Sequence, residues 1–421
     1  MKFELNPLTT LLASTPESFD HTVGYHDIRP FNSNNNLVLL HRSPKKNLGF
    51  KDKSIKVEIC IWDIKNSTIK KIDETDTWSW EQGARLQWVG DNEFVYNKSY
   101  KQNPSSIIYN IKTNKTTILD TCIYSYNKNK FLSVNYARLW KLWKSYGYNN
   151  LLSLNINIDK KKPDDDGVFL SDLNHNKNLI LSINKAVKLC GLDNVDKDFF
   201  LCHPTFNPSG NKFISLLRYF NDSGALISYL ICTDINSENS IILAREKVSH
   251  FEWLNDTDII VWCRNLSQKI IKLRNNRFLE KKVFPIIKKI LNISKTDLKN
   301  KILKNDYHLI NINKPSEAKG LNNKILNEDG HPQISPDKKF LITDTYPNNN
   351  GFMKLLLLKI DANKIFEIGK FKIAEYLEKN SLKYDLHPRW DNSGKLINID
   401  SSHLESRQNY IIDISKLLSK I

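Results

Sequence analysis

Short apolar stretches alternate with turn residues along most of this chain, and three segments repeat one pattern. The segments HPTFNPSGNKFISLLRY from His203, HPQISPDKKFLITDTYP from His331 and HPRWDNSGKLINIDSSH from His387 each pass from a His-Pro pair through a polar turn to an apolar strand. An apolar run on each side of a Pro, Asp, Ser or Gly turn is typical of a β-hairpin. The pattern therefore predicts a repeated β-hairpin.

Weaker copies of this hairpin keep a similar internal offset. The histidine lies ten positions before the second apolar strand in the first copy and nine positions before it in the other two. Further copies begin at His26, Arg85 and His250, and a seventh begins near Tyr124. A third strand follows most hairpins and a fourth usually follows that one, so the sequence indicates seven units of four strands.

This repeat predicts an all-β fold, a seven-bladed β-propeller of four-stranded antiparallel blades in one domain over residues 1–421. A β-sandwich followed by an α/β tail is the alternative, which the regular spacing disfavours. The last unit lacks a fourth strand after Ile412, and we expect the N-terminal KFEL to supply it as the outer strand of the last blade. Two inserts are expected, at 138–167 in blade three and at 281–330 between blades five and six, the second partly helical over VFPIIKKILNISKTDLKNKIL.

Charge and cysteine usage narrow the class of protein. The 421 residues include 62 Lys and Arg against 46 Asp and Glu, a net charge of +16. This excess favours an anionic partner, although Lys and Asn crowd every loop and a general compositional bias explains the charge equally well. No apolar stretch is long enough to span a membrane, and the six cysteines form no C-x-x-C pair. We expect buried free thiols and a cytoplasmic protein.

The unusual residues of the repeat should gather on one face of the ring. Because the strands of a blade alternate in direction, the entries to the first strands, the ends of the second strands and both inserts share that face. One histidine before proline is commonly a structural hydrogen-bonding group, but five such positions, including His26 and His250, favour a functional site. We expect His203, His331 and His387 to converge with Arg85 and Arg389 at the mouth of the central channel.

Basic and aromatic residues on the same face are candidates for binding a substrate. The run RLWKLWKSYGY from Arg138 suits contact with sugar rings or bases, and burial against the neighbouring blade is its alternative. Packing between blades is also the alternative for Tyr346 and Trp390. The candidate substrate-binding residues are Arg138, Tyr136, Tyr346, Arg389, His403 and Arg407.

The repeated hairpin resembles the TolB-like propeller repeat, and the segments DGHPQISPD, TDTYP, YDLHPRW and IDSSH resemble the oligogalacturonate-lyase group of propellers. The general repeat covers most of the chain, and the closer match rests on units four, six and seven. The resemblance implies β-elimination of a uronic-acid-containing saccharide, a divalent metal, Mn or Ca, held by histidines, and an arginine or histidine that abstracts the C5 proton. By position, His331 and His387 are metal ligands, and Asp385 stands where the lyase pattern has a histidine. The stretch SLKYD stands where that pattern has a glutamine.

The residues also suit this chemistry on general grounds. Removal of a proton α to a carboxylate requires a cation to neutralise the carboxylate and a base within hydrogen-bond reach. We assign the catalytic roles to His203, Arg218 and Arg85, with His331 as an alternative base. The expected partner is an acidic oligosaccharide or polysaccharide. The alternative function is a non-catalytic propeller that binds an acidic glycan or a protein partner, and nucleic-acid binding rests only on net charge and the RLWKLWK run.

Overall fold

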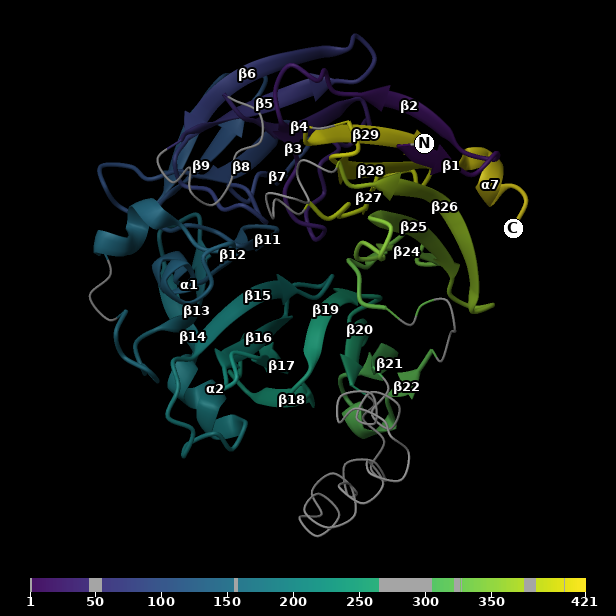
Figure 1. Ribbon diagram of the computed structural model, residues 1–421. Coiled ribbons are helices and arrows are strands. Elements are labelled where there is room, and N and C mark those ends of the chain that lie inside the picture. Colours follow the sequence, from purple (N-terminus) through teal and green to yellow (C-terminus); the bar gives the residue numbers. More distant parts are fainter. Residues whose placement is uncertain are drawn as a thin grey trace, which may run out of the picture.

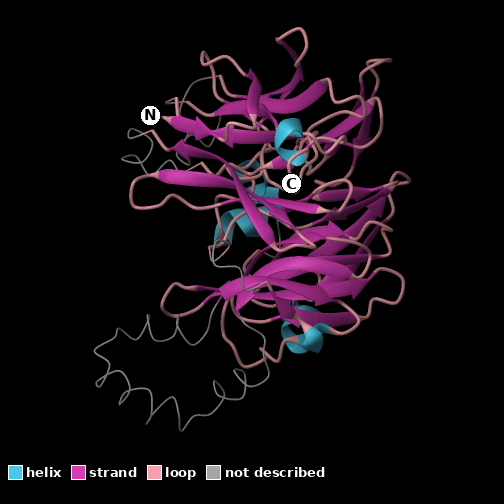
Figure 2. Ribbon diagram, turned by 90° about the vertical axis from the view of Figure 1, so that its right-hand side faces the viewer, coloured by secondary structure: helices cyan, strands magenta, loops and turns pink. Residues whose placement is uncertain are grey.

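The chain forms a ring of seven antiparallel β-sheets around a common centre (Figure 1). The structure, a computed structural model, describes residues 2–44, 55–154, 158–264, 305–321, 326, 328–374, 384–404 and 406–421. Each sheet is one blade, with its first strand near the centre of the ring and its last strand at the rim. Strands make up most of the described structure in the perpendicular view (Figure 2). The predicted all-β seven-bladed propeller is confirmed.

The first four blades follow one another along the chain. Blade one contains β3 (His21–Thr22), β4 (Leu37–Arg42), β5 (Val57–Asp63) and β6 (Thr68–Thr75), and blade two contains β7 (Gln87–Trp88), β8 (Glu93–Asn97), β9 (Ser106–Asn110) and β10 (Thr116–Leu119). Blade three contains β11 (Ser125–Asn127), β12 (Lys130–Ser133), β13 (Gly167–Asp172) and β14 (Lys177–Ser182), and blade four contains β15 (Phe200–Phe206), β16 (Lys212–Phe220), β17 (Leu226–Asp234) and β18 (Ser240–Ala244).

Blade five is again consecutive in the chain, whereas blades six and seven each include one strand from the N-terminal end. Blade five contains β19 (Val248–Trp253), β20 (Asp258–Arg264), β21 (Asn305–Asn311) and β22 (Lys319–Gly320). Blade six contains β23 (Gln333–Ile334), β24 (Phe340–Asp344), β25 (Phe352–Lys359), β26 (Lys364–Lys372) and β1 (Phe3–Leu5), and blade seven contains β27 (Arg389–Trp390), β28 (Leu396–Ser401), β29 (Gln408–Asp413) and β2 (Thr10–Ser14).

Ring closure differs from the sequence prediction. The KFEL segment, as β1, pairs with β26 and extends blade six, so its assignment to the last blade is wrong. The outer strand of blade seven is β2, which pairs with β29 from Thr10 opposite Asp413 to Ser14 opposite Tyr410. The N-terminal segment therefore covers the outer edges of β26 and β29 in two neighbouring blades.

The two inserts lie at the same position in their blades. The first, between β12 and β13, contains α1 (Tyr136–Leu142) and the 3-10 helix η1 (Asn149–Leu154). Residues 305–320, which we expected to belong to the second insert, instead form the third and fourth strands of blade five. The connection between β20 and β21 covers 265–304, and the helix predicted there lies outside the described residues. Elsewhere in the described chain lie the short helices α2 (Ile183–Leu189), η3 (Pro315–Glu317) and α7 (Ser415–Leu418).

In several blades a polar residue of the repeat closes the first hairpin by accepting backbone hydrogen bonds. In blade four, Asn207 Oδ1 accepts from the amides of Asn211 and Lys212 at 3.1 and 2.9 Å. In blade seven, Asp391 Oδ1 accepts from Lys395 and Leu396 in the same way. Asn and Asp favour such turns because the side chain replaces a backbone acceptor. The repeat pattern is thus a pattern of turn-capping groups.

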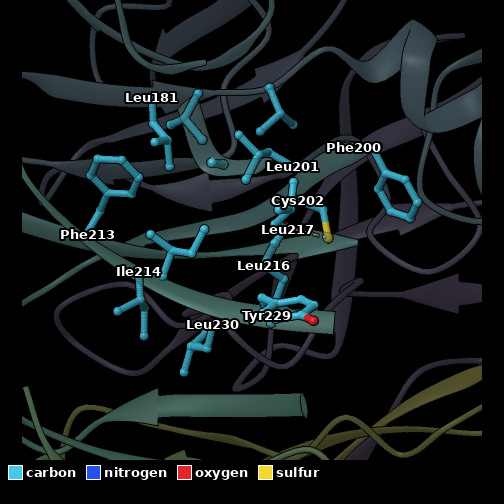
Figure 3. Packing of buried hydrophobic residues seen from close by; sticks show 14 of the residues in the cluster. Leu181, Phe200, Leu201, Cys202, Phe213, Ile214, Leu216, Leu217, Tyr229 and Leu230 are labelled. Atoms are coloured by element: carbon cyan, nitrogen blue, oxygen red, sulfur yellow. Dashed lines mark hydrogen bonds between the residues drawn. The ribbon is translucent and has the colours of Figure 1, made fainter. Parts of the chain in front are cut away.

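Apolar side chains fill the space between neighbouring blades. Leu181 of β14 lies among Phe213 and Ile214 of β16 and the side chains of β15 (Figure 3), so one cluster joins blades three and four. All six cysteines are buried and free, as predicted. Among the described residues, no helix is long and apolar enough to cross a membrane.

Candidate metal and active site

Five histidines surround the ring of Tyr25 near the centre of the propeller. The centroid of Tyr25 lies between 4.5 and 6.3 Å from the centroid of each imidazole ring, and it stacks on His203 with an interplanar angle of 10°. The five are His26, His203, His250, His331 and His387. His203 and His250 lie in the first strands of blades four and five, His331 and His387 lie just before the first strands of blades six and seven, and His26 follows β3 of blade one. The ring thus brings one imidazole from each of five blades to one place.

Local backbone irregularities direct several of these side chains inward. His203 and His250 lie at β-bulges, where the pairing register of β15 and of β19 shifts. Bulges redirect side chains and are common beside active sites. His203, His387 and Arg85 have positive φ angles of 55°, 43° and 52°, a conformation that costs free energy for any residue except glycine. The fold holds equivalent positions of three blades in this strained conformation.

Three of the predicted residues form a group suited to a metal ion. The candidate ligand atoms of His331, Asp385 and His387 all lie within 4.8 Å of one another. His331 Nε2 lies 4.0 Å from Asp385 Oδ2, and Asp385 keeps 18% of its side-chain surface exposed. Imidazole nitrogens and a carboxylate are common ligands of divalent metals. The structure thus brings together the three residues to which the sequence assigned a metal.

Asp344, at the end of β24, positions both histidines of this group. Its Oδ1 accepts hydrogen bonds at 2.8 Å from the His331 amide and from His331 Nδ1, and its Oδ2 accepts from the His387 amide at 3.1 Å. Gly330 permits this approach, because a Cβ atom there would lie 1.9 Å from Asp344 O. A carboxylate behind a ligating imidazole fixes its tautomer and orientation. Asp344 leaves His331 Nε2 as the ligand atom.

The nitrogens of His387 support a metal at this position. The residue is fully buried, and neither Nδ1 nor Nε2 has a hydrogen-bond partner. A buried polar group without a partner costs about 1–3 kcal/mol. Coordination of a cation by one of these nitrogens would remove part of that cost. The residues present therefore fit a divalent metal.

Two further histidines present their Nε2 atoms in the same way. Nδ1 of His26 lies 3.0 Å from the carbonyl oxygen of Pro332, and Nδ1 of His250 lies 3.0 Å from Asp329 Oδ1. Both oxygens are acceptors, so each Nδ1 carries the proton and each Nε2 has a free lone pair. The imidazole of His331 lies 5.5 Å from His26 and 4.3 Å from His250, centroid to centroid.

His203 lies on the other side of Tyr25, in a separate hydrogen-bond network. The Tyr124 hydroxyl and the Gln82 amide nitrogen lie 2.7 and 3.1 Å from its Nδ1. Arg218 Nη1, which can only donate, lies 3.4 Å from its Nε2, so donors face both ring nitrogens. Tyr146 of the blade-three insert adds an edge contact to His203 at 5.2 Å, which places that insert at the site.

The histidines differ in their tendency to bind protons. Burial, followed by the charge of Arg218, lowers the pKa of His203 well below its ordinary value, and burial likewise lowers the pKa of His26 and His387. Burial also opposes protonation of His331, but the adjacent Asp344 carboxylate outweighs it and raises the pKa of His331 to about 9. His203 is therefore a neutral imidazole at pH 7, able to accept a proton.

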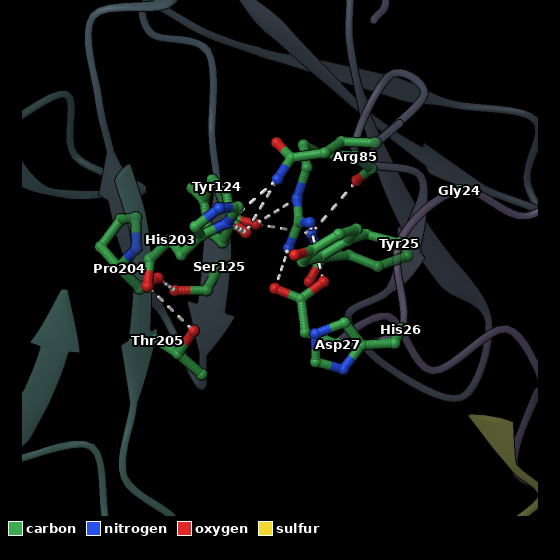
Figure 4. Close-up of polar contacts among 12 residues, drawn as sticks. Gly24, Tyr25, His26, Asp27, Arg85, Tyr124, Ser125, His203, Pro204 and Thr205 are labelled. Carbon is green, nitrogen blue, oxygen red and sulfur yellow. Dashed lines mark hydrogen bonds and ion pairs between the residues drawn. The ribbon is translucent and has the colours of Figure 1, made fainter. Parts of the chain in front are cut away.

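Two of the predicted arginines are held in buried ion pairs. Arg85 forms a two-point pair with Asp27 at 2.8 and 3.0 Å and donates from Nε to the carbonyl of Tyr124 (Figure 4). Arg389 pairs with Asp400 at 3.1 Å and donates to the carbonyls of Gly24 and Tyr25. Both therefore position the segment that carries Tyr25 and His26.

Other predicted substrate-binding residues have packing environments. Arg138 is buried against Asp166 at 2.6 Å, and Tyr136 stacks on Tyr148 at 4.0 Å. His403 packs between Phe3 and Phe371 of the outer strands of blade six, with ring centroids 4.9 and 5.6 Å away. Arg407 lies over the Tyr384 ring and donates to Trp80 O. Trp390 is buried and donates to Gln333 O, which agrees with its packing interpretation.

Tyr346 differs from these residues because it combines exposure with proximity to the site. It is 40% exposed, and its ring centroid lies 5.8 Å from that of His331. Sequence reasoning did not assign Tyr25 or Tyr124 to the site, although one copy of the repeat begins near Tyr124. The adjacency of Tyr25 to His26 was the available signal for one of them.

Comparisons with known proteins agree with the architecture. No protein-family model matches the chain, and no curated protein matches it by sequence. Among solved structures it is similar to oligogalacturonate lyase in complex with manganese, with a TM-score of 0.60, 11% identity, and coverage of 98% of this chain and 96% of that one. For the oligogalacturonate lyase of Vibrio parahaemolyticus the TM-score is 0.58 and the identity 10%, with 98% of this chain and 96% of that one covered. For TolB of Acinetobacter baumannii the TM-score is 0.37 and the identity 10%, with 90% of this chain and 82% of that one covered. At these identities the likeness to the two lyases establishes the fold.

Proposed function

We propose that this propeller is a lyase that cleaves a uronic-acid-containing oligosaccharide by β-elimination, with a divalent cation at its centre. The group formed by His331, Asp385 and His387 carries the proposal, because it joins three potential ligands in a buried site where neither nitrogen of His387 has another partner. One structurally similar protein, the oligogalacturonate lyase in complex with manganese, is named for the same class of reaction. Bound there, the cation would supply Lewis-acid neutralisation of the uronate carboxylate.

His203 is the base in this proposal. Its neutral imidazole has a lone pair on Nε2, and Arg218 lies beside that atom. The guanidinium of Arg218 can pair with a substrate carboxylate, which increases the acidity of the proton on the neighbouring carbon. The proposal places the imidazole proton on Nδ1, where the Tyr124 hydroxyl can accept a hydrogen bond. Arg85 and Arg389 orient the Tyr25 segment, and Tyr346 offers an exposed aromatic surface for a sugar ring.

A non-catalytic binding function is the second candidate, and burial favours it. Each of the five histidines is at most 8% exposed. A cation enclosed by these rings would stabilise the propeller, while an acidic glycan would bind beside Tyr346 and Asp385 on the more exposed side. This function predicts glycan binding without turnover.

One assay distinguishes the two candidates. The full chain is treated with a chelator, reloaded with Mn²⁺ or Ca²⁺ and incubated with a panel of uronic-acid oligosaccharides, while the ultraviolet absorbance of an unsaturated product is followed. We expect product formation that is lost in His387→Ala and His203→Gln but retained in His175→Ala, an exposed histidine paired with Asp120. Glycan binding with no product from any substrate would favour the non-catalytic function.

A further inference from the structure

A cavity of about 200 Å³ lies between blades two and three, and none of the five central histidines lines it. Its lining comes from the loop between β8 and β9, the connection from β10 to β11, the insert of blade three, and the strands β13 and β14. An engineered cavity of about 150 Å³ is large enough to enclose benzene. This cavity therefore has room for a small ring that carries one further group.

The two carboxylates in the described lining of this cavity are paired with cations of the protein. Asp166 Oδ2 accepts from Arg138 Nε at 2.6 Å and from Asn135 Nδ2 at 2.8 Å. Asp165 forms an ion pair with Lys160 at 3.1 Å. Neither carboxylate therefore requires a cation from outside the chain.

The hydroxyl groups and the thiol of the lining also have partners within the protein. Thr121 Oγ1 donates to Ser133 Oγ at 3.1 Å, and Ser133 Oγ donates to the carbonyl oxygen of Cys122. The thiol of Cys122 donates to Ser105 O at 3.4 Å, and the hydroxyl of Tyr136 donates to a backbone carbonyl at 2.8 Å. These neutral groups form a wall whose hydrogen bonds are already made.

Lys177, the first residue of β14, differs from the rest of the lining. Within the described residues its Nζ has no ion pair and no hydrogen bond, and it lies 4.6 Å from the centroid of the Phe169 ring. The face of an aromatic ring attracts a cation, so Phe169 holds the ammonium group beside the cavity. Lys177 keeps contact with solvent, yet burial lowers the pKa of its ammonium group. A ligand in the cavity would therefore meet one unpaired positive charge.

We propose that this cavity binds a small cyclic carboxylate, with the carboxylate group on Lys177 and the ring against the apolar part of the wall. That part of the wall includes Val134, Ala137, Leu151 and Phe169. An ammonium group without an opposite charge selects an anionic group on the ligand. A bare inorganic anion would leave the apolar wall without contacts, which favours an organic ligand. The site is separate from the proposed cation site and does not depend on the lyase reaction.

Ligand-detected NMR titration of the full chain with benzoate tests the proposal, with benzamide and acetate as comparison probes. Benzamide keeps the ring and lacks the charge, whereas acetate keeps the carboxylate and lacks the ring. The decisive variant is Lys177→Met, which removes the charge and keeps the length of the side chain. Lys130→Met is the matched control, because Lys130 is an exposed residue of β12 in the same blade and lies outside the lining of the cavity.

Two further variants locate the binding site. Ala137→Leu fills the cavity with a larger side chain and leaves Lys177 in place, and its thermal unfolding transition verifies that the chain is folded. His387→Ala alters the central site and leaves the cavity unchanged. The pair therefore separates binding in the cavity from binding at the central cluster of histidines.

We expect the wild-type chain, Lys130→Met and His387→Ala to bind benzoate with equal affinity. Lys177→Met should bind it at least about tenfold more weakly, because a charge-assisted hydrogen bond is lost. Ala137→Leu should fold and lose benzoate binding, because its larger side chain occupies the space of the ring. Benzamide and acetate should each bind to the wild-type chain more weakly than benzoate.

Several results would overturn the inference, and each has a distinct meaning. Equal benzoate affinity in Lys177→Met and the wild-type chain would exclude Lys177 as the partner of the carboxylate. Benzoate binding that persists in folded Ala137→Leu, or that is lost in His387→Ala, would place the ligand outside the cavity. Equal affinity for benzamide or acetate would remove the requirement for a charge or for a ring, and absence of benzoate binding would remove the site. The lyase proposal is judged separately, by its unsaturated product.

Discussion

Thr15 directly follows the closing strand β2, and its hydroxyl group connects the end of that strand to β29. Its Oγ1 donates to Gln408 Oε1 at 2.6 Å and accepts from the Asn409 amide at 3.0 Å, and the residue is buried. The substitution Thr15→Val keeps the shape of the side chain and removes both hydrogen bonds. Gln408 Oε1 retains His21 Nδ1 at 3.1 Å, whereas the Asn409 amide loses this acceptor.

The expected loss of stability follows from these two bonds. A lost hydrogen bond costs about 1 kcal/mol, and a buried amide without an acceptor costs about 1–3 kcal/mol. The preference of valine for strands recovers only a fraction of 1 kcal/mol. We therefore expect the free energy of unfolding to fall by about 2–3 kcal/mol.

Urea unfolding followed by tryptophan fluorescence measures this change. Thr10→Val is the matched control, because Thr10 begins the same strand and is exposed. Its effect should stay within about 0.5 kcal/mol, as for other surface substitutions. A loss in Thr15→Val no larger than that of Thr10→Val would refute the view that this hydroxyl helps to close the ring.

Three further predictions concern the site and its surroundings. Asp344→Asn removes the negative charge and one of the two acceptor oxygens behind the two candidate histidine ligands, and calorimetry should show ten- to hundredfold weaker Mn²⁺ binding; equal affinity would contradict its positioning role. His41 is buried, donates from Nδ1 to Thr22 O and accepts from the Ala84 amide at Nε2, and burial lowers its pKa to about 4. Between pH 6.5 and 4 the unfolded chain binds a proton at His41 that the folded chain does not bind. The free energy of unfolding should therefore fall by about 1.4 kcal/mol per pH unit over this range. Urea titrations of His41→Gln should lack this contribution to the pH dependence. Gly83→Ala would place a methyl group 2.3 Å from His41 Cε1 at a φ of +57°, so urea unfolding should show a loss of about 2 kcal/mol or more, with Gly90→Ala unaffected.

The candidate site was predictable where it belongs to the repeat. The recurring His-Pro entries placed His203, His331 and His387 at equivalent positions of their blades, and the ring brings these positions to its centre. The environments of Arg85 and Arg389 were not predictable, because their partners Asp27 and Asp400 are 58 and 11 residues away in the sequence. A sequence does not show whether a guanidinium is free to bind a substrate, because the carboxylate that pairs with it can come from another segment of the chain.

The sequence by itself determined the number of blades, the hairpin turns and the buried cysteines, because each depends on local chemistry. A side chain such as Asn207 caps its own turn, and alternating apolar residues define a strand wherever they occur. Only the tertiary structure decided which N-terminal segment closes which blade. KFEL and TLLAS are both short enough to form an edge strand, and the choice depends on where the chain passes after the ring has closed. The stacking of Trp80 on Tyr384 was decided in the same way, by a contact between segments that share no local pattern.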